Sequence, residues 1–315
     1  MSDRVLTVSS SPHIRSKQTT MSIMRDVLIA LAPASILSIV FFGWKSLLLI
    51  AICIVSCIAA EAAMQKFMKK PITVGDLSAA VTGLLIALNL PINAPWWVAL
   101  IGSVFAITIV KQLFGGIGFN FVNPALAARV FLVASWPTHM SGSAYLPADA
   151  VSSATPLAIW SGESAGELPS ILQMFLGNGV YGCIGEVSAA ALILGGIYLI
   201  IRKVITPVIP LGYLGTVAVF SLIAGLGFDG MLFQLFAGGL MLGAIFMATD
   251  YVTSPATPLG QLIYAIGCGL MTCIIRFYGG YSEGVMFSIL FMNIASPLID
   301  KYIRAKKYGE VKKNA

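Results

Sequence analysis

The chain consists largely of long apolar runs separated by short breaks that contain charged residues, Pro or Gly. The run from Ser46 to Ala63 (SLLLIAICIVSCIAAEAA) is apolar over a length close to the roughly 20 residues of a membrane helix. Strands of a membrane β-barrel alternate apolar and polar side chains instead, so this class is excluded. The pattern predicts an all-α integral membrane protein with about ten transmembrane helices, near residues 27–42, 46–64, 77–90, 96–112, 124–135, 187–201, 208–226, 232–248, 259–276 and 284–300.

Basic residues between the spans predict the orientation of the chain. Lys and Arg in short loops are retained in the cytoplasm. With about ten spans, each of four basic groups falls on that side: Arg15, Lys17 and Arg25; Lys66, Lys69 and Lys70; Arg202 and Lys203; and the tail from Lys301 to Lys313. Both termini are then cytoplasmic. The predicted parts are a cytoplasmic segment 1–26, a first membrane repeat 27–135, an outer loop 136–186, a second membrane repeat 187–300 and a basic tail 301–315.

The two predicted membrane parts resemble each other. The first part contains, in this order, LLIALNLPINAPWW, Lys111 and FNFVNPALAARVF. The second part contains, in the same order, GAIFMATDYVTSPATPL, Arg276 and FMNIASPLIDKY. Each set has an apolar helix, a polar break with Pro, a helix ending in a cation, and then Asn followed by Pro. Because the copies begin on opposite sides of the membrane, they predict two inverted five-helix repeats, an arrangement that often places a site between broken helices. Ordinary tight loops at these breaks are the alternative.

Composition agrees with a membrane protein and narrows the function. Hydrophobic residues make up 58% of the 315 residues and charged residues only 10%, whereas soluble domains have about 25% charged residues. The formal charge of +6 reflects 19 Lys and Arg against 13 Asp and Glu, and because the cations flank apolar runs, it indicates topology and not nucleic-acid binding. The five cysteines form no pair or cluster typical of a disulfide framework or a metal site. The polar start of the chain lacks the features of a cleavable signal peptide.

One motif in the predicted outer loop suggests a cofactor. The string Ser152-Ser153-Ala154-Thr155-Pro-Leu resembles the S/T-x-A-T signature at which a flavin transferase esterifies the phosphate of FMN to the threonine hydroxyl. Together with GFNFVNPALAARVF and MATDYVTSPATPLG, it is similar to the family of the D subunit of the Rnf-type ion-translocating ferredoxin:NAD oxidoreductase complex. That family also includes the B subunit of the sodium-translocating NADH:quinone oxidoreductase. The resemblance extends over nearly the whole chain.

The resemblance implies a membrane flavoprotein subunit of an electron-transport complex in a bacterial or archaeal cytoplasmic membrane. Thr155 would carry FMN covalently on the outer face, and a second, non-covalent flavin such as riboflavin would lie between the repeats. The implied partners are a second FMN-bearing subunit, iron–sulfur subunits and other subunits of the complex, a flavin transferase for maturation, and Na⁺ or H⁺ as the translocated ion. The subunit would not be catalytic alone.

Further candidate residues lie at the helix breaks. Arg129 is a charge inside a predicted span and a candidate flavin contact, with a salt bridge to an acidic neighbour as the alternative. Asn120 and Asn123 offer amide groups for a flavin edge or a partly dehydrated ion, and Asp250 and Thr253 are the candidates in the second repeat. Glu61 and Glu186 lie near predicted helix ends and are expected to be solvated. Lys111 and Arg276 occupy matching places in the two repeats, with a role as interfacial anchors as the alternative.

Three other functions fit parts of the sequence. A channel or secondary transporter for a small solute also uses inverted repeats with broken helices, but it has no use for the Ser-Ala-Thr string in an acidic outer loop. The quinone-reducing relative is the nearer alternative, although its amino-terminal extension is typically longer than the 26 polar residues present here. An assembly subunit without a cofactor is the third.

Overall fold

The structure is a computed structural model that describes residues 18–140, 142–145, 155–162, 168–177, 182–281 and 283–303. Within these ranges the chain forms helices and loops, with no β-strand. The helices are α1 Thr20–Phe42, α2 Trp44–Phe67, α3 Ser78–Leu88, α4 Trp96–Phe105, α5 Pro124–Ser135, α6 Pro137–Met140, α7 Pro156–Trp160, α8 Ile171–Leu176, α9 Ala189–Ile201, α10 Val208–Ile223, α11 Gly227–Phe236, α12 Leu240–Leu242, α13 Pro258–Tyr278 and α14 Val285–Tyr302. Two π-helical segments, Ala106–Gln112 and Gly243–Met247, continue α4 and α12, and 3₁₀ turns occupy Val74–Asp76, Gly142–Tyr145 and Ile184–Glu186.

The chain is a multi-pass membrane protein. Among the described helices, α1, α2 and α13 are long and apolar enough to cross a membrane, and α11 with α12 adds a fourth if this bent pair is one span. Five shorter apolar stretches of 10–17 residues coincide with other predicted spans, and α14 lies at the last predicted position. Large apolar side chains such as Val40, Ile223 and Leu211 face outward, which fits a surface solvated by lipid.

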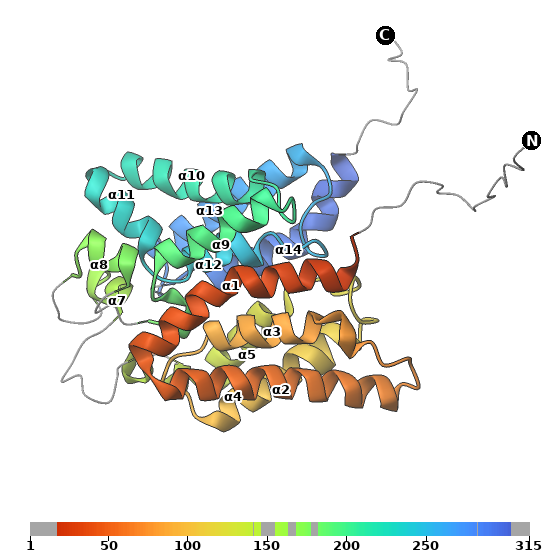
Figure 1. The fold of residues 1–315 in the computed structure, drawn as a ribbon. Helices are drawn as coiled ribbons and strands as arrows, with labels where there is room; N and C mark the ends of the chain where they lie inside the picture. Colours follow the sequence, from red (N-terminus) through yellow and green to blue (C-terminus); the bar gives the residue numbers. More distant parts are fainter. Residues whose placement is uncertain are drawn as a thin grey trace, which may run out of the picture.

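The helices form two groups joined by α1 (Figure 1). In one group α2 packs against α3 and α4, and in the other α13 packs against α10 and α14. Helix α1 packs lengthwise on α9, which belongs to the second group. This contact is very close, because a Cβ atom added to Gly195 of α9 would lie 2.1 Å from the carbonyl oxygen of Ala30 in α1.

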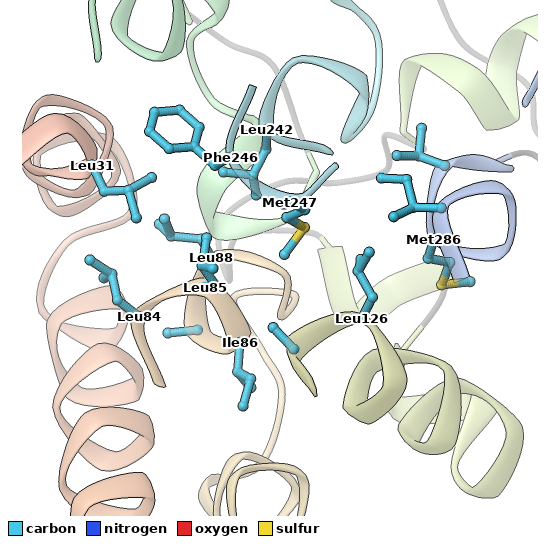
Figure 2. Packing of buried hydrophobic residues seen from close by; sticks show 14 of the residues in the cluster. Leu31, Leu84, Leu85, Ile86, Leu88, Leu126, Leu242, Phe246, Met247 and Met286 are labelled. Atoms are coloured by element: carbon cyan, nitrogen blue, oxygen red, sulfur yellow. The ribbon is translucent and has the colours of Figure 1, made fainter. Parts of the chain in front are cut away.

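The centre of the molecule is an apolar core where short helices of both groups meet. Figure 2 shows Leu84 and Leu88 of α3 facing Leu242 and Phe246, which belong to α12 and the π-helical segment after it. Since lipid is as apolar as these side chains, their packing gains close contacts and little hydrophobic free energy. A close fit between the helices is therefore what holds the core together.

Two of the differences from the predicted helix boundaries have a clear local cause. Helix α1 begins at Thr20, seven residues before the predicted start, because Thr19 and Ser22 cap it reciprocally through their side chains and backbone N–H groups. The predicted span 232–248 is broken, and its two helices are bent by 65°. The bend occurs at Gly238, whose φ of +68° is readily adopted only by glycine.

Candidate functional site

The candidate attachment residue, Thr155, stands at the start of a short helix. It is the N-cap of α7, and its Oγ1 accepts a hydrogen bond from the N–H of Ala158 at 3.3 Å. The residue is half-buried. Ser152, Ser153 and Ala154 lie outside the described residues. Helix α7 is held by Trp160, whose ring packs on those of Phe233 and Phe277.

The same four-residue string occurs a second time. Ala154-Thr155-Pro-Leu is repeated as Ala256-Thr257-Pro-Leu, and a serine stands three residues before each threonine. Thr257 caps α13 as Thr155 caps α7, accepting from the N–H of Gly260 at 3.1 Å. Local sequence and capping geometry therefore do not distinguish the two threonines. Their surroundings distinguish them, because the Thr257 hydroxyl also donates a hydrogen bond to the carbonyl oxygen of Ile303, near the end of α14.

Three of the candidate residues at the helix breaks line one cavity of about 110 Å³. Asn120 and Asn123 precede α5, whereas Asp250 follows the π-helical segment of the other group, so the cavity lies between the groups. Asn123 caps α5 and also donates to the carbonyl oxygen of Met247 at 3.3 Å. The rest of the lining is mostly apolar and includes Ile23 and other residues from the first turns of α1.

Asp250 is the acidic group of this cavity. Its carboxylate accepts hydrogen bonds from the N–H of Val252 and the hydroxyl of Thr253, both at 3.3 Å. Burial raises the pKa of Asp250, and these hydrogen bonds, with one from Asn120, oppose the rise. Thr253 is itself buried. It therefore acts through Asp250 and does not line the cavity.

A buried ion pair lies at the cavity wall. Lys111 Nζ lies 2.8 Å from Glu61 Oε1 and donates to Ser78 Oγ at 2.6 Å. Both side chains are almost fully buried, so the expectation of a solvated Glu61 and the alternative of an interfacial Lys111 are wrong. A signal for the pair is present in the sequence, since charges inside apolar runs require partners. Lys111 lies in a π-helical segment, a local geometry frequent at functional sites.

Arg129 is the centre of a second buried cluster. Its Nη2 donates to Glu283 Oε2 at 2.6 Å, its Nη1 donates to Asn89 Oδ1 at 2.7 Å, and Nη1 lies 3.6 Å from Glu186 Oε1. The salt bridge to an acidic neighbour, the alternative for Arg129, is what the structure contains. Glu186 is only 8% exposed, so its expected solvation is wrong. Burial, and next the Glu283 carboxylate, raise the pKa of Glu186.

Arg276 has a structural task at the broken helix. It donates to the carbonyl oxygens of Gln234 and Ala237 at 2.6 and 2.9 Å. These carbonyls end α11 and would otherwise be unsatisfied. Arg276 is buried, so it is not an interfacial anchor.

Helix α7 and the cavity lie toward opposite ends of the helix stack. In Figure 1, α7 and α8 are at the left, whereas α1 begins at the right. Since the cavity is lined by the first turns of α1, it is remote from α7. The Arg129 cluster lies on the α7 side, because Leu157 of α7 and Glu283 both flank Gly238.

Comparisons with known proteins give one consistent result. The model of the NQR2, RnfD, RnfE family matches residues 7–309. The chain is 57% identical to the D subunit of the Na⁺-translocating ferredoxin:NAD⁺ oxidoreductase complex of Acetobacterium woodii, over 100% of this chain and 99% of that protein. It is 42% identical to the D subunit of the proton-translocating ferredoxin:NAD⁺ oxidoreductase complex of Clostridium ljungdahlii, over 97% and 96%. Identity to the D subunit of the ion-translocating oxidoreductase complex of Halorhodospira halophila is 37%, over 97% and 96%. The chain therefore belongs to the NQR2, RnfD, RnfE family.

Proposed function

We propose that this protein is the membrane-embedded, flavin-carrying subunit of an ion-translocating ferredoxin:NAD⁺ oxidoreductase complex. The observation that carries the proposal is a half-buried Thr155 in an S-x-A-T string at the head of α7. The relatives named above, which are subunits of such complexes, support it. The ten-span arrangement with two inverted repeats, cytoplasmic termini and α7 on the outer face belongs to the same proposal.

Thr155 would anchor the cofactor without taking part in the redox chemistry. Its Oγ1 would form the phosphoester of FMN, and the isoalloxazine ring supplies one- and two-electron chemistry when bound. A covalent tether keeps the ring at a high local concentration without tight non-covalent binding. Among the described residues the hydroxyl makes the 3.3 Å cap bond and no other, so esterification would remove little from this part of the fold. A flavin transferase outside the membrane would install the group.

The cavity between the groups is the proposed site for a second, non-covalent flavin such as riboflavin. Amide groups of Asn120 and Asn123 and the Asp250 carboxyl suit the polar edge of an isoalloxazine, and the apolar lining suits its faces. The volume of about 110 Å³ is below that of a cavity known to hold a benzene ring, about 150 Å³. Binding would therefore require side chains at the cavity mouth to move apart.

The other redox centres and the translocated ion complete the proposal. All five cysteines are buried and unpaired, so iron–sulfur clusters and a second FMN would lie on other subunits. Na⁺ or H⁺ would be coupled through contacts that differ between oxidised and reduced flavin, since only a differential interaction shifts a conformational equilibrium. The two relatives named first above differ in the ion that their names give, so identity to them does not select one.

The deciding experiment is in-gel flavin fluorescence of the denatured protein made with a flavin transferase. Thr155→Val should be dark and wild type fluorescent. Thr257→Val is the matched control, because it removes the same cap in the same Ala-Thr-Pro-Leu string, and it should stay fluorescent. Flavin released on denaturing the Thr155→Val protein would be the non-covalent one. Fluorescence that survives in Thr155→Val, or that disappears in Thr257→Val, would exclude Thr155 as the sole attachment site.

A further inference from the structure

The cluster around Arg129 contains more acidic groups than its geometry satisfies. Glu186 and Glu283 both lie near Arg129, and Arg276 is a second cation near Glu283. Only Glu283 is well paired, through Arg129 Nη2 at 2.6 Å and the N–H of Gly239 at 2.5 Å. Glu186 receives its hydrogen bonds from Cys183, whose N–H donates to Oε2 at 3.2 Å and whose thiol also hydrogen-bonds the carboxylate. Among the described residues its Oε1 receives none, and Arg129 Nε also has no hydrogen-bond partner there.

Burial makes this imbalance costly for a charged Glu186. Its side chain is 8% exposed and that of Arg129 is 6% exposed. A buried carboxylate without a full set of donors is unfavourable, and two carboxylates that share a site cannot both ionise easily. The other titratable groups that face Glu186 are Cys183 and Tyr145, while Arg276 is the second cation near Glu283. A proton on Oε1 relieves both the desolvation and the repulsion from Glu283.

The cluster is connected directly to the attachment helix. Leu157 lies two residues after Thr155, and its Cδ1 would be 2.6 Å from a Cβ atom at Gly238. Glu283 Oε1 would be 3.1 Å from the same Cβ. At the neighbouring Gly239, a Cβ atom would lie 3.2 Å from Glu186 Oε1. Both carboxylates therefore lie beside the segment that Leu157 contacts, and charge carried by a group tethered at Thr155 would act on them through a medium of low dielectric constant.

We propose that Glu186, with Glu283 as its partner, binds one exchangeable proton that compensates the charge of an electron held by the flavin at Thr155. This inference rests on the proposed function. The electron comes from a one-electron donor, an iron–sulfur cluster or flavin of a neighbouring subunit, and the proton comes from water outside and binds Glu186 Oε1. No bond to the flavin forms or breaks, and the proton leaves when the electron passes on.

The first test measures the flavin midpoint potential against pH in the purified complex, for wild type and Glu186→Gln. A carboxylate near the flavin disfavours an added electron, so the wild-type potential should bend downward as pH rises through about 7, where Glu186 loses its proton. The glutamine side chain of Glu186→Gln is uncharged at every pH of the titration. This variant should match wild type at acidic pH, show no bend, and have the more positive potential at alkaline pH. Asp229→Asn, which removes an exposed carboxylate of α11, should behave as wild type.

The second test detects the proton without any flavin at Thr155. Infrared difference spectra of the Thr155→Val complex, recorded between acidic and alkaline pH, should contain the C=O stretch of a protonated carboxyl that titrates near pH 7 and is absent after Glu186→Gln. Glu283→Gln, which removes the neighbouring negative charge, should shift this titration to lower pH.

The two proposals fail in different ways. Fluorescence that persists in Thr155→Val would refute the attachment site and leave the infrared band untouched. The other case is that fluorescence is lost in Thr155→Val. If the infrared band is then the same in Glu186→Gln as in its parent, or is absent at every pH, the proton site alone is refuted.

Discussion

At the scale of single residues, the Lys111–Glu61 pair fixes the wall of the cavity. Removing one partner of a buried ion pair leaves an uncompensated charge and costs about 3–5 kcal/mol. We therefore expect Lys111→Met to lower the thermal midpoint of the detergent-solubilised protein strongly, measured by the fraction that stays monodisperse after heating. The double variant Lys111→Met/Glu61→Gln should recover most of the loss, because no isolated charge remains. An equally unstable double variant would show that Lys111 acts through its bond to Ser78 Oγ.

Residue patterns locate polar side chains at helix breaks better than they predict the surroundings of those side chains. Asn120, Asn123 and Asp250 are polar groups at predicted helix breaks, and they share a cavity. Glu61 and Glu186 each lie near a predicted helix end, which suggests solvent, yet both are buried against a cation that is distant in the chain. The sequence indicates that charges inside apolar runs require partners, but it does not show which distant residue is the partner.

At the scale of helices, the contact between α1 and α9 joins the two groups. Gly195 allows α9 to approach the Ala30 carbonyl, so we expect Gly195→Leu to separate the helices. Overpacking of this kind costs about 1–3 kcal/mol, and the variant should yield less folded protein in the membrane. Gly215→Leu in α10 is the matched control, because a Cβ atom there meets nothing within 4 Å and the new side chain would face lipid. Equal yields of both variants would mean that the α1–α9 contact is dispensable.

Helix positions are predictable because an apolar run of sufficient length has few alternatives in a membrane. Pro33 and Pro297 lie inside α1 and α14 without ending them, as is common in membrane helices. The break after α11 could not be predicted in this way, because it lies inside an apolar run and no polar residue stands at the break to mark it. Gly238 and Gly239 stand in an apolar run and look like packing residues, and only the backbone shows that Gly238 turns the chain.

At the scale of the whole molecule, the number of membrane crossings decides the arrangement. Between Lys69, after α2, and Asp229, at the start of α11, lie α3, α4, α5, α9 and α10. Each of these is too short to qualify as a span by length alone. If all five cross, the two residues face opposite sides, with Lys69 in the cytoplasm. If one of them turns back within the membrane, both residues face the same side and α7 cannot be assigned to the outer face.

Cysteine labelling with a membrane-impermeant maleimide distinguishes these arrangements. All five native cysteines are buried, so wild type should react weakly and serves as the background. In intact cells Asp229→Cys should be labelled and Lys69→Cys should not, whereas in inverted vesicles the pattern should be reversed. Labelling of both from one side would contradict five crossings between them. The Thr155 hydroxyl could then not be assigned to the outer face, on which the proposed flavin transferase acts.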